Sequence, residues 1–210
     1  MKIGILGSGM VGQALALGLK KAGHDVRLGS RDGKKLDAFA KEHGFTQGTF
    51  ADVAAFGEAV VFCMKGEVAE GVAKEFAKVL AGKLVLDTTN PIAGPPNNGV
   101  IPYFTAAGDS LIQRIQKAAP EAKVVKWMNS VGSHFMANPK FKGGTPSMFI
   151  CGDDAGAKAT TTKLSADLGW NTEDVGGAGM GGPLEALCQI WCAPGFLRND
   201  WAHGFAMLRP

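Results

Sequence analysis

Hydrophobic and polar positions follow two alternating patterns along residues 1–127. Short, unbroken apolar runs, typical of buried strands, lie between segments whose apolar positions are three and four residues apart, as on one face of a helix. Strands are expected at 2–6, 25–28, 59–64, 84–88 and 122–127, and helices at 11–22, 34–43, 68–80 and 111–115. Strands that alternate with helices predict right-handed crossovers and a parallel sheet covered on both faces.

Beyond residue 90 the pattern changes twice. Residues 91–109 are rich in Pro, Gly and Asn, so we expect a long surface loop there, either a lid over a ligand or a plain connection. After Trp127 a second unit begins, with strands expected at 147–151 and 172–175 and helices at 155–168 and from Leu184 onward. We therefore expect an α/β protein with a doubly wound parallel sheet in residues 1–125 and a small C-terminal α/β domain in residues 126–210.

The stretch GSGMVG at residues 7–12 matches the G-x-G-x-x-G pattern of dinucleotide-binding turns. It follows an apolar run and opens a helix, where Gly7 permits the tight turn, Gly9 lets the backbone approach a pyrophosphate and Gly12 allows close packing. The free amides of the helix N-terminus also favour an anion. The larger domain is therefore predicted to be a Rossmann domain. Its predicted nucleotide contacts in this turn are Gly7, Ser8, Gly9, Met10, Val11 and Gly12.

The residues after the second expected strand bear on the choice between NAD and NADP. An acid there would accept a hydrogen bond from the ribose 2′-hydroxyl, but the chain reads Gly29-Ser30-Arg31. A serine hydroxyl and a guanidinium can both donate to a 2′-phosphate, and lysines at 34 and 35 add positive charge. Asp32 is the alternative ribose ligand. Because Gly29 is expected to end the strand and place Ser30 and Arg31 first, we predict NADP.

Further contacts are expected from the loops at the carboxyl ends of the strands, where ligands collect in open parallel sheets. Pro91 favours an extended backbone at Asn90, which would present the side chain and carbonyl of Asn90 to a nicotinamide. His134, after the last strand of the first unit, is the histidine best placed near that ring, either as a catalytic acid or in a structural role. The predicted contacts are Met64, Lys65, Thr89, Asn90, Pro91, Ser130 and Gly132.

Two dehydrogenase classes fit the chain poorly. The short-chain type needs a lysine four residues after its tyrosine, but Tyr103, the only tyrosine, is followed there by Ala107. The β-hydroxyacid dehydrogenases and pyrroline-carboxylate reductases have a sizeable helical C-terminal domain, and only residues 128–210 follow Trp127 here, so these classes are less expected but stay open. A site without an obvious proton donor suits hydride transfer to a flavin-like ring. Residues that would line its pocket, unless they simply pack in the core, are Met136, Pro183, Leu184 and Trp191.

Charge, hydropathy and cysteine content restrict the kinds of partner and compartment that the sequence predicts. The net charge of +3 is spread along the chain, which argues against nucleic acid, and no apolar run reaches the length of about 20 residues that a membrane helix needs. The N-terminal pattern and the scarce cysteines lead us to expect a cytoplasmic protein with reduced thiols and no metal. Cys188 and Cys192, four residues apart, can share a metal or a disulfide, although a buried helix face explains them more simply.

Several stretches together resemble the NADP-dependent reductases of the deazaflavin coenzyme F420, with which the cytosolic domain of six-transmembrane ferric reductases shares the pattern. They are MKIGILGSGMVGQALALGLKKAGHDVRLGSRD at 1–32, DTTNP at 87–91, VVKWMNSVGSHFMANP at 124–139 and ICGDD at 150–154. The resemblance implies a flavin-type ring between the two domains and a homodimer. It also implies that Ser30, Arg31, Ser8 and Lys35 hold the 2′-phosphate. The chain departs from the family at Met64-Lys65, where Ile-Pro is frequent, and beyond ICGDD.

We therefore expect an NADPH-dependent oxidoreductase that transfers a hydride between NADP(H) and coenzyme F420 or a flavin such as FMN or FAD. Two alternatives stay open. One is a non-catalytic sensor that binds NADP. The other is a reductase of a small imine or carbonyl that uses His134 as its acid.

Overall fold

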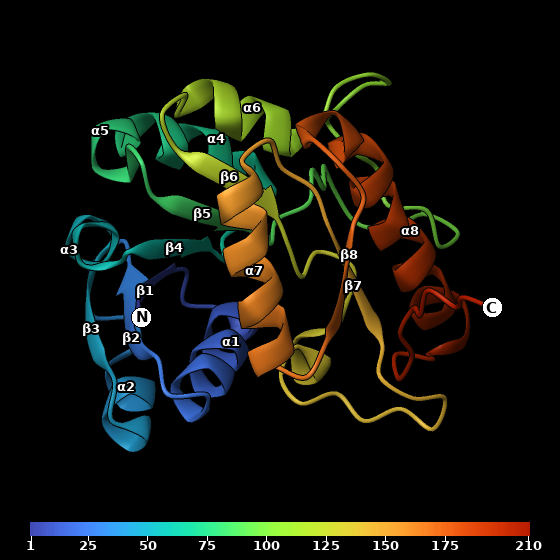
Figure 1. Cartoon of the computed structure of the whole chain (residues 1–210), viewed down its shortest axis with the longest axis horizontal. Coiled ribbons are helices and arrows are strands. Elements are labelled where there is room, and N and C mark those ends of the chain that lie inside the picture. The colour runs from blue at the N-terminus through green and yellow to red at the C-terminus, as the bar shows by residue number, and fades with distance from the viewer.

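A computed structural model describes the whole chain, from Met1 to Pro210. Its largest element is a six-stranded parallel sheet with the order β3-β2-β1-β4-β5-β6 (Figure 1). The strand order reverses between β1 and β4, and this reversal opens a crevice at their carboxyl ends, where open α/β sheets bind ligands. The strands are β1 (Lys2–Leu6), β2 (Asp25–Ser30), β3 (Thr46–Thr49), β4 (Ala59–Phe62), β5 (Leu84–Asp87) and β6 (Lys123–Lys126).

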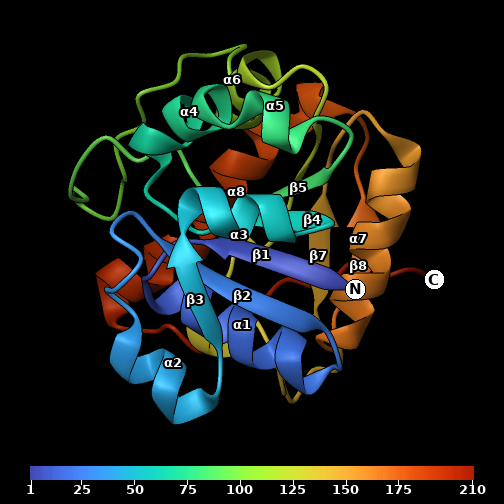
Figure 2. The same ribbon diagram turned by 90° about the vertical axis from the view of Figure 1, so that its left-hand side faces the viewer.

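Helices cover both faces of this sheet because its central strands are apolar on both sides. In β4, Ala59 and Val61 pack into one core, whereas Val60 and Phe62 pack into the other. Figure 2 shows α3, α4, α5 and α6 on one side of the sheet and α1 and α2 on the other. These helices are α1 (Met10–Lys21), α2 (Asp37–His43), α3 (Phe50–Phe56), α4 (Gly66–Glu75), α5 (Ala77–Leu80) and α6 (Leu111–Ala118).

The second unit is a two-stranded parallel sheet joined to the edge of the first. It consists of β7 (Ser147–Ile150), α7 (Ala155–Asp167) and β8 (Asn171–Asp174), followed by the long helix α8 (Gly181–Arg198). The Lys126 amide donates to the carbonyl of Cys151 over 2.9 Å, which attaches the small sheet to β6. Met148 packs in one core with Ile5, and Leu184 packs in the other with Val85, so both cores continue across residue 125. The expected α/β fold with a Rossmann sheet and a small second sheet is confirmed.

Several expected boundaries are wrong. The second strand continues through Ser30, so Gly29 does not end it. The helix expected at 34–43 begins at Asp37, the helix expected at 68–80 is two helices that begin at Gly66 and Ala77, and the last helix begins at Gly181. No helix has both the length and the hydropathy needed to cross a bilayer.

Two elements, β3 and α3, were not expected. β3 has the sequence TQGT and lies at the sheet edge, where its residues are half-buried or exposed, so no apolar run marks it. The start of α3 does carry a sequence signal. The Thr49 hydroxyl accepts from the Asp52 amide and the Asp52 carboxylate accepts from the Thr49 amide, which forms a capping box.

A fully buried lysine joins the two units. Lys126, the last residue of β6, places Nζ 2.6 Å from Asp87 Oδ2 and 2.9 Å from Glu185 Oε1, and it donates to the Thr89 carbonyl over 2.9 Å. All three charged side chains are almost without solvent contact. Burial alone would lower the pKa of Lys126, but the two carboxylates outweigh this effect and raise the pKa. Lys126 therefore stays charged in the core.

The carboxylates of this ion network are also satisfied by the backbone. Glu185, on α8, accepts from the amides of Leu111 and Ile112, the first two residues of α6, over 3.1 and 3.2 Å. Asp87 Oδ1 accepts from the amide and the hydroxyl of Thr89, over 2.9 and 2.6 Å. The network thus connects β5, β6, α6 and α8, together with the loop that follows β5.

Replacing Lys126 tests the energetic importance of this network. We expect Lys126→Met to lower the free energy of unfolding by roughly 3–5 kcal/mol, because it leaves two buried carboxylates without their cation. Chemical denaturation of both proteins measures the change. The matched control is Lys158→Met, which removes an ion pair of 2.9 Å with the more exposed Asp174 and should cost about 0–1 kcal/mol. Equal losses in the two variants would contradict this account.

Candidate dinucleotide and acceptor site

A cavity of about 1000 Å³ lies at the crevice between β1 and β4. A smaller cavity of about 470 Å³ shares part of its lining, including Val11, Cys63 and Met64, and extends toward the end of β5. Together the two cavities form one cleft. Predicted residues that line the larger cavity are Gly7, Ser8, Gly9, Met10, Val11, Ser30, Arg31, Lys35, Met64, Lys65, Gly132 and His134, and the smaller cavity adds Thr89 and Asn90. Gly12, Pro91 and Ser130 line neither cavity.

The glycine turn is packed tightly on its inner side and is open on its outer side. Gly7 has a φ of +149°, and a Cβ there would lie 2.1 Å from the carbonyl oxygen of Cys63, which directly follows the adjacent strand β4. A Cβ on Gly12 would lie 2.6 Å from the Gly7 carbonyl oxygen, whereas a Cβ on Gly9 would meet no atom within 4 Å. No side chain caps the start of α1, so its first amides are free for an anion.

The basic corner, which we define as Ser30, Arg31 and Lys35, lies beside this turn. The Ser30 hydroxyl donates to Asp32 Oδ1 over 2.8 Å, and the amides of Lys34 and Lys35 donate to the same oxygen over 3.0 and 3.1 Å. The Lys34 amide, the Ser30 hydroxyl and the Lys35 amide lower the pKa of the Asp32 carboxyl. Asp32 therefore holds the turn that carries the cations. Arg31 is exposed and forms no ion pair within the chain, so its guanidinium is free for a ligand.

The polar groups after β5 are engaged by the protein itself, contrary to the expectation for Asn90. The Asn90 side-chain amide donates to the Asn129 carbonyl over 2.8 Å, and Asn90 Oδ1 accepts from Asn129 Nδ2 over 3.1 Å. The Asn90 carbonyl accepts from the Ile92 amide over 2.8 Å. These groups fix the floor of the cleft rather than standing free. The Asn90 side chain is thus bound to Asn129, in the loop after β6, and is not presented to a nicotinamide.

The far wall of the cleft comes from the second unit. A Cβ on Gly132 would lie 2.9 Å from both His134 Cε1 and Trp191 Cη2, so the loop after β6 touches α8 directly. His134 stacks at a tilt on Phe135 with ring centroids 4.3 Å apart, and no protein group forms a hydrogen bond with it. No carboxylate therefore orients His134 for proton transfer.

Six residues that sequence reasoning did not single out also line the larger cavity: Phe50, Glu67, Val68, Val72, Ser133 and Trp201. Phe50 belongs to the unexpected helix α3, and Trp201 follows α8, so only the tertiary fold brings them to the cleft. Cys63 lines it as well, but burial raises its pKa to about 12, so it is a neutral thiol at pH 7.

Of the four residues suggested for an acceptor pocket, only one lies in the cleft. Trp191 lines the cleft, whereas Met136 and Leu184 belong to the two cores and Pro183 is exposed. Cys188 and Cys192 are free thiols with sulfurs 3.8 Å apart, so the structure contains no disulfide between them. Nowhere in the structure do three or more His, Cys, Asp or Glu side chains lie close enough together to hold a metal ion.

The fold is of the Rossmann type, and the comparisons with known proteins place the chain among NADP-dependent oxidoreductases. The sequence model of the family described as NADP oxidoreductase, coenzyme F420-dependent, matches residues 2–91. The chain belongs to this family, which confirms the resemblance seen in the sequence. It is similar over the full length of both chains to the crystal structure of a proposed F420-dependent NADP reductase from Arthrobacter sp. FB24, with 34% identity and a TM-score of 0.92.

Two more distant relatives extend the comparison. A hypothetical protein from Sinorhizobium meliloti shares the fold, with 22% identity over 86% of this chain and 88% of the other and a TM-score of 0.75. The metalloreductase STEAP3 of Rattus norvegicus is 27% identical over 187 residues, which are 89% of this chain. The chain spans 36% of the length of that relative.

Two glycines of the turn should respond differently to alanine. Gly9→Ala places its methyl group in open space, so we expect normal stability but a loss of NADP⁺ affinity of about tenfold or more, since the methyl group blocks the pyrophosphate. Gly12→Ala forces a methyl group against the Gly7 carbonyl and should cost about 1–3 kcal/mol of stability. Calorimetric titration and denaturation measure the two effects. An unchanged affinity in Gly9→Ala would place the pyrophosphate elsewhere.

Arg31 should discriminate between the two nucleotides. We expect Arg31→Ala to cost about 1.5–3 kcal/mol of NADPH binding and far less of NADH binding, because only NADPH carries the 2′-phosphate. Titration with both nucleotides measures the difference. Lys41→Ala, which removes an exposed lysine of α2 outside the cleft, serves as the control. Equal losses for NADPH and NADH in Arg31→Ala would refute the assignment.

Proposed function

We propose that this protein transfers a hydride between NADP(H) and a flavin-type ring, either coenzyme F420 or a flavin such as FMN or FAD. One observation carries the proposal: a single cavity joins the glycine turn and the basic corner to a wall formed by Gly132, His134 and Trp191. The first part suits a dinucleotide. The second part is aromatic and lacks a paired acid and base, which suits an acceptor ring.

The residues of the first part fit NADP in size and charge. The open face at Gly9 leaves room for a pyrophosphate, and Arg31 and Lys35 supply donors for a 2′-phosphate. When bound, NADPH supplies the hydride. Val11, Cys63 and Met64 line both cavities, and their apolar surface would exclude water where the nicotinamide meets its acceptor.

The alternative reaction, reduction of a small imine or carbonyl, needs a positioned acid. His134 is the candidate beside the aromatic wall, but it has no hydrogen-bonding partner to orient it. Lys65 and Glu67 also line the cleft, but they are exposed and pair with each other over 3.6 Å. A flavin-type ring has no such requirement, because it can exchange its proton with solvent. The sensor alternative leaves the aromatic wall of the cleft without a role.

Anaerobic stopped-flow measurements test the reaction. We expect NADPH to reduce at least one acceptor in a panel of coenzyme F420, riboflavin and FMN. We also expect His134→Gln to change the rate of hydride transfer by less than about threefold, since no protein acid is needed. A loss of about 100-fold or more in His134→Gln would support acid catalysis instead. If wild-type protein reduces no acceptor in the panel, the proposed function is wrong.

A further inference from the structure

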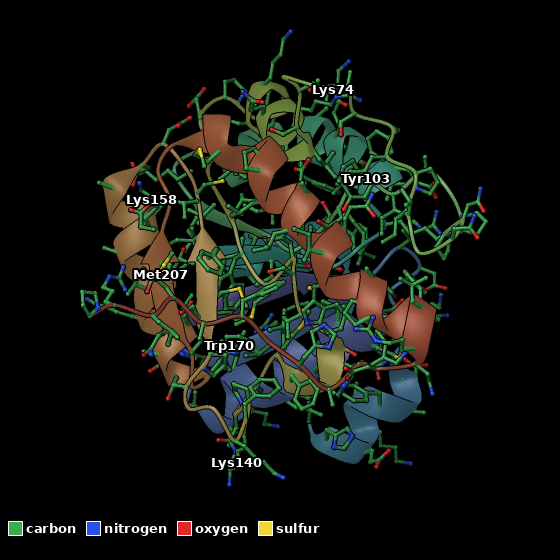
Figure 3. All side chains as sticks on the ribbon, turned by 90° about the vertical axis from the view of Figure 1, so that its right-hand side faces the viewer. Lys74, Tyr103, Lys140, Lys158, Trp170 and Met207 are labelled. Carbon is green, nitrogen blue, oxygen red and sulfur yellow. The ribbon has the colours of Figure 1, made fainter.

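The C-terminal tail, residues 199–210, returns from the end of α8 and is bound along the second unit (Figure 3). The Trp191 indole donates to the His203 carbonyl over 3.0 Å, and His203 Nε2 donates to the Trp191 carbonyl over 2.8 Å. Farther along, the Ser147 amide donates to the Phe205 carbonyl over 2.8 Å. Beyond Met207, which Figure 3 labels beside β7, the tail ends in an ion pair between Arg209 and Glu173 of β8.

This tail places Trp201 on the cleft. A Cβ on Gly195 of α8 would lie 2.3 Å from the indole, so the absence of a side chain there lets the ring lie directly on the helix. Phe196 meets the Trp201 ring edge-on at 5.0 Å, and the Trp191 ring lies 5.8 Å away at 45°. The indole is therefore supported by its neighbours, and Trp191 and Trp201 both line the larger cavity.

The charges around the cavity are distributed unevenly. Its lysines, arginine and carboxylates, which are Arg31, Asp32, Lys35, Lys65 and Glu67, all follow strands of the Rossmann sheet. The lining from the second unit has no lysine or arginine and consists of Val131, Gly132, Ser133, His134, Trp191 and Trp201. Such a surface offers stacking and apolar contact but no fixed partner for a phosphate.

We propose that Trp201 forms a stacking wall of the acceptor subsite and makes the enzyme select its acceptor by the planar ring rather than by the charged tail. This inference rests on the proposed function and deepens it. Indoles stack well on flat heteroaromatic rings, and the support from Gly195 and Phe196 keeps the Trp201 ring in place before the acceptor arrives. Riboflavin and FMN, which share a ring but differ by a phosphate, should then be used almost equally well.

Steady-state kinetics with riboflavin and FMN test the proposal. We expect Trp201→Leu to raise the KM for riboflavin about tenfold with little change in NADPH affinity, and Trp201→Phe to stay within about threefold of wild type. In wild type, the two flavins should have kcat/KM values within about threefold of each other. Phe56→Leu is the matched control, because Phe56, at the end of α3, lines neither cavity and packs against Arg27 rather than Trp201. An unchanged riboflavin KM in Trp201→Leu, or a strong preference for FMN, would overturn the proposal.

A binding measurement on the wild-type sequence keeps the proposal testable if Trp201→Leu fails to fold or if no flavin is turned over. Protein labelled with 5-fluorotryptophan has one fluorine resonance for each of its four tryptophans, and Trp201→Phe assigns that of Trp201. In the presence of NADP⁺, added riboflavin should shift the Trp201 resonance more than those of the buried Trp127 and Trp170. An unmoved Trp201 resonance overturns the stacking wall. A lack of turnover by itself contradicts only the proposed function.

Discussion

The buried charge of Lys126 is the constraint on which the cleft depends. A lysine without solvent contact is tolerable only because Asp87 and Glu185 lie within ion-pair distance of it, and each carboxylate is held in turn by backbone amides. Asp87 ends β5 just before Thr89 and Asn90 of the cleft floor, and Glu185 lies on α8, which supplies Trp191 to the wall. The position of one ammonium group thus fixes floor and wall relative to each other, and the same group holds the Thr89 carbonyl in place.

The parts of the fold that the sequence predicts are those determined by local pattern. The apolar runs of β1, β4 and β5 and the glycine turn before α1 can be recognised within a few residues, so their positions were expected nearly as found. β3 was missed because an edge strand needs no apolar run, and its TQGT sequence resembles a loop. The break at Phe76 between α4 and α5 interrupts a helical pattern that continues on both sides of it.

The residues of the site also divide into those that a local motif predicts and those that only the tertiary fold places. The glycine turn and the basic corner are each a short stretch of sequence, and the strand–turn–helix–strand motif brings the two together, so their presence in one cavity, Gly12 apart, followed from the motif. The roles of Asn90 and Ser30 did not, because a hydrogen bond goes to whichever partner the fold presents. Asn129, 39 residues from Asn90, takes both ends of the Asn90 amide, and Asp32 takes the Ser30 hydroxyl. The place of Trp201 in the cleft could not be predicted from the sequence, since no local pattern indicates that the tail after α8 returns to the cleft.

The continuity of the two cores across residue 125 has a consequence for how the protein accommodates its ligands. Hinged enzymes close because two bodies meet at a small interface and can rotate about a few residues. Here such a rotation would pull Met148 out of one core and Leu184 out of the other in the same movement, and it would expose the buried charges as well. The cleft is therefore preorganised during folding, and any adjustment on binding falls to surface loops rather than to a movement of one unit against the other.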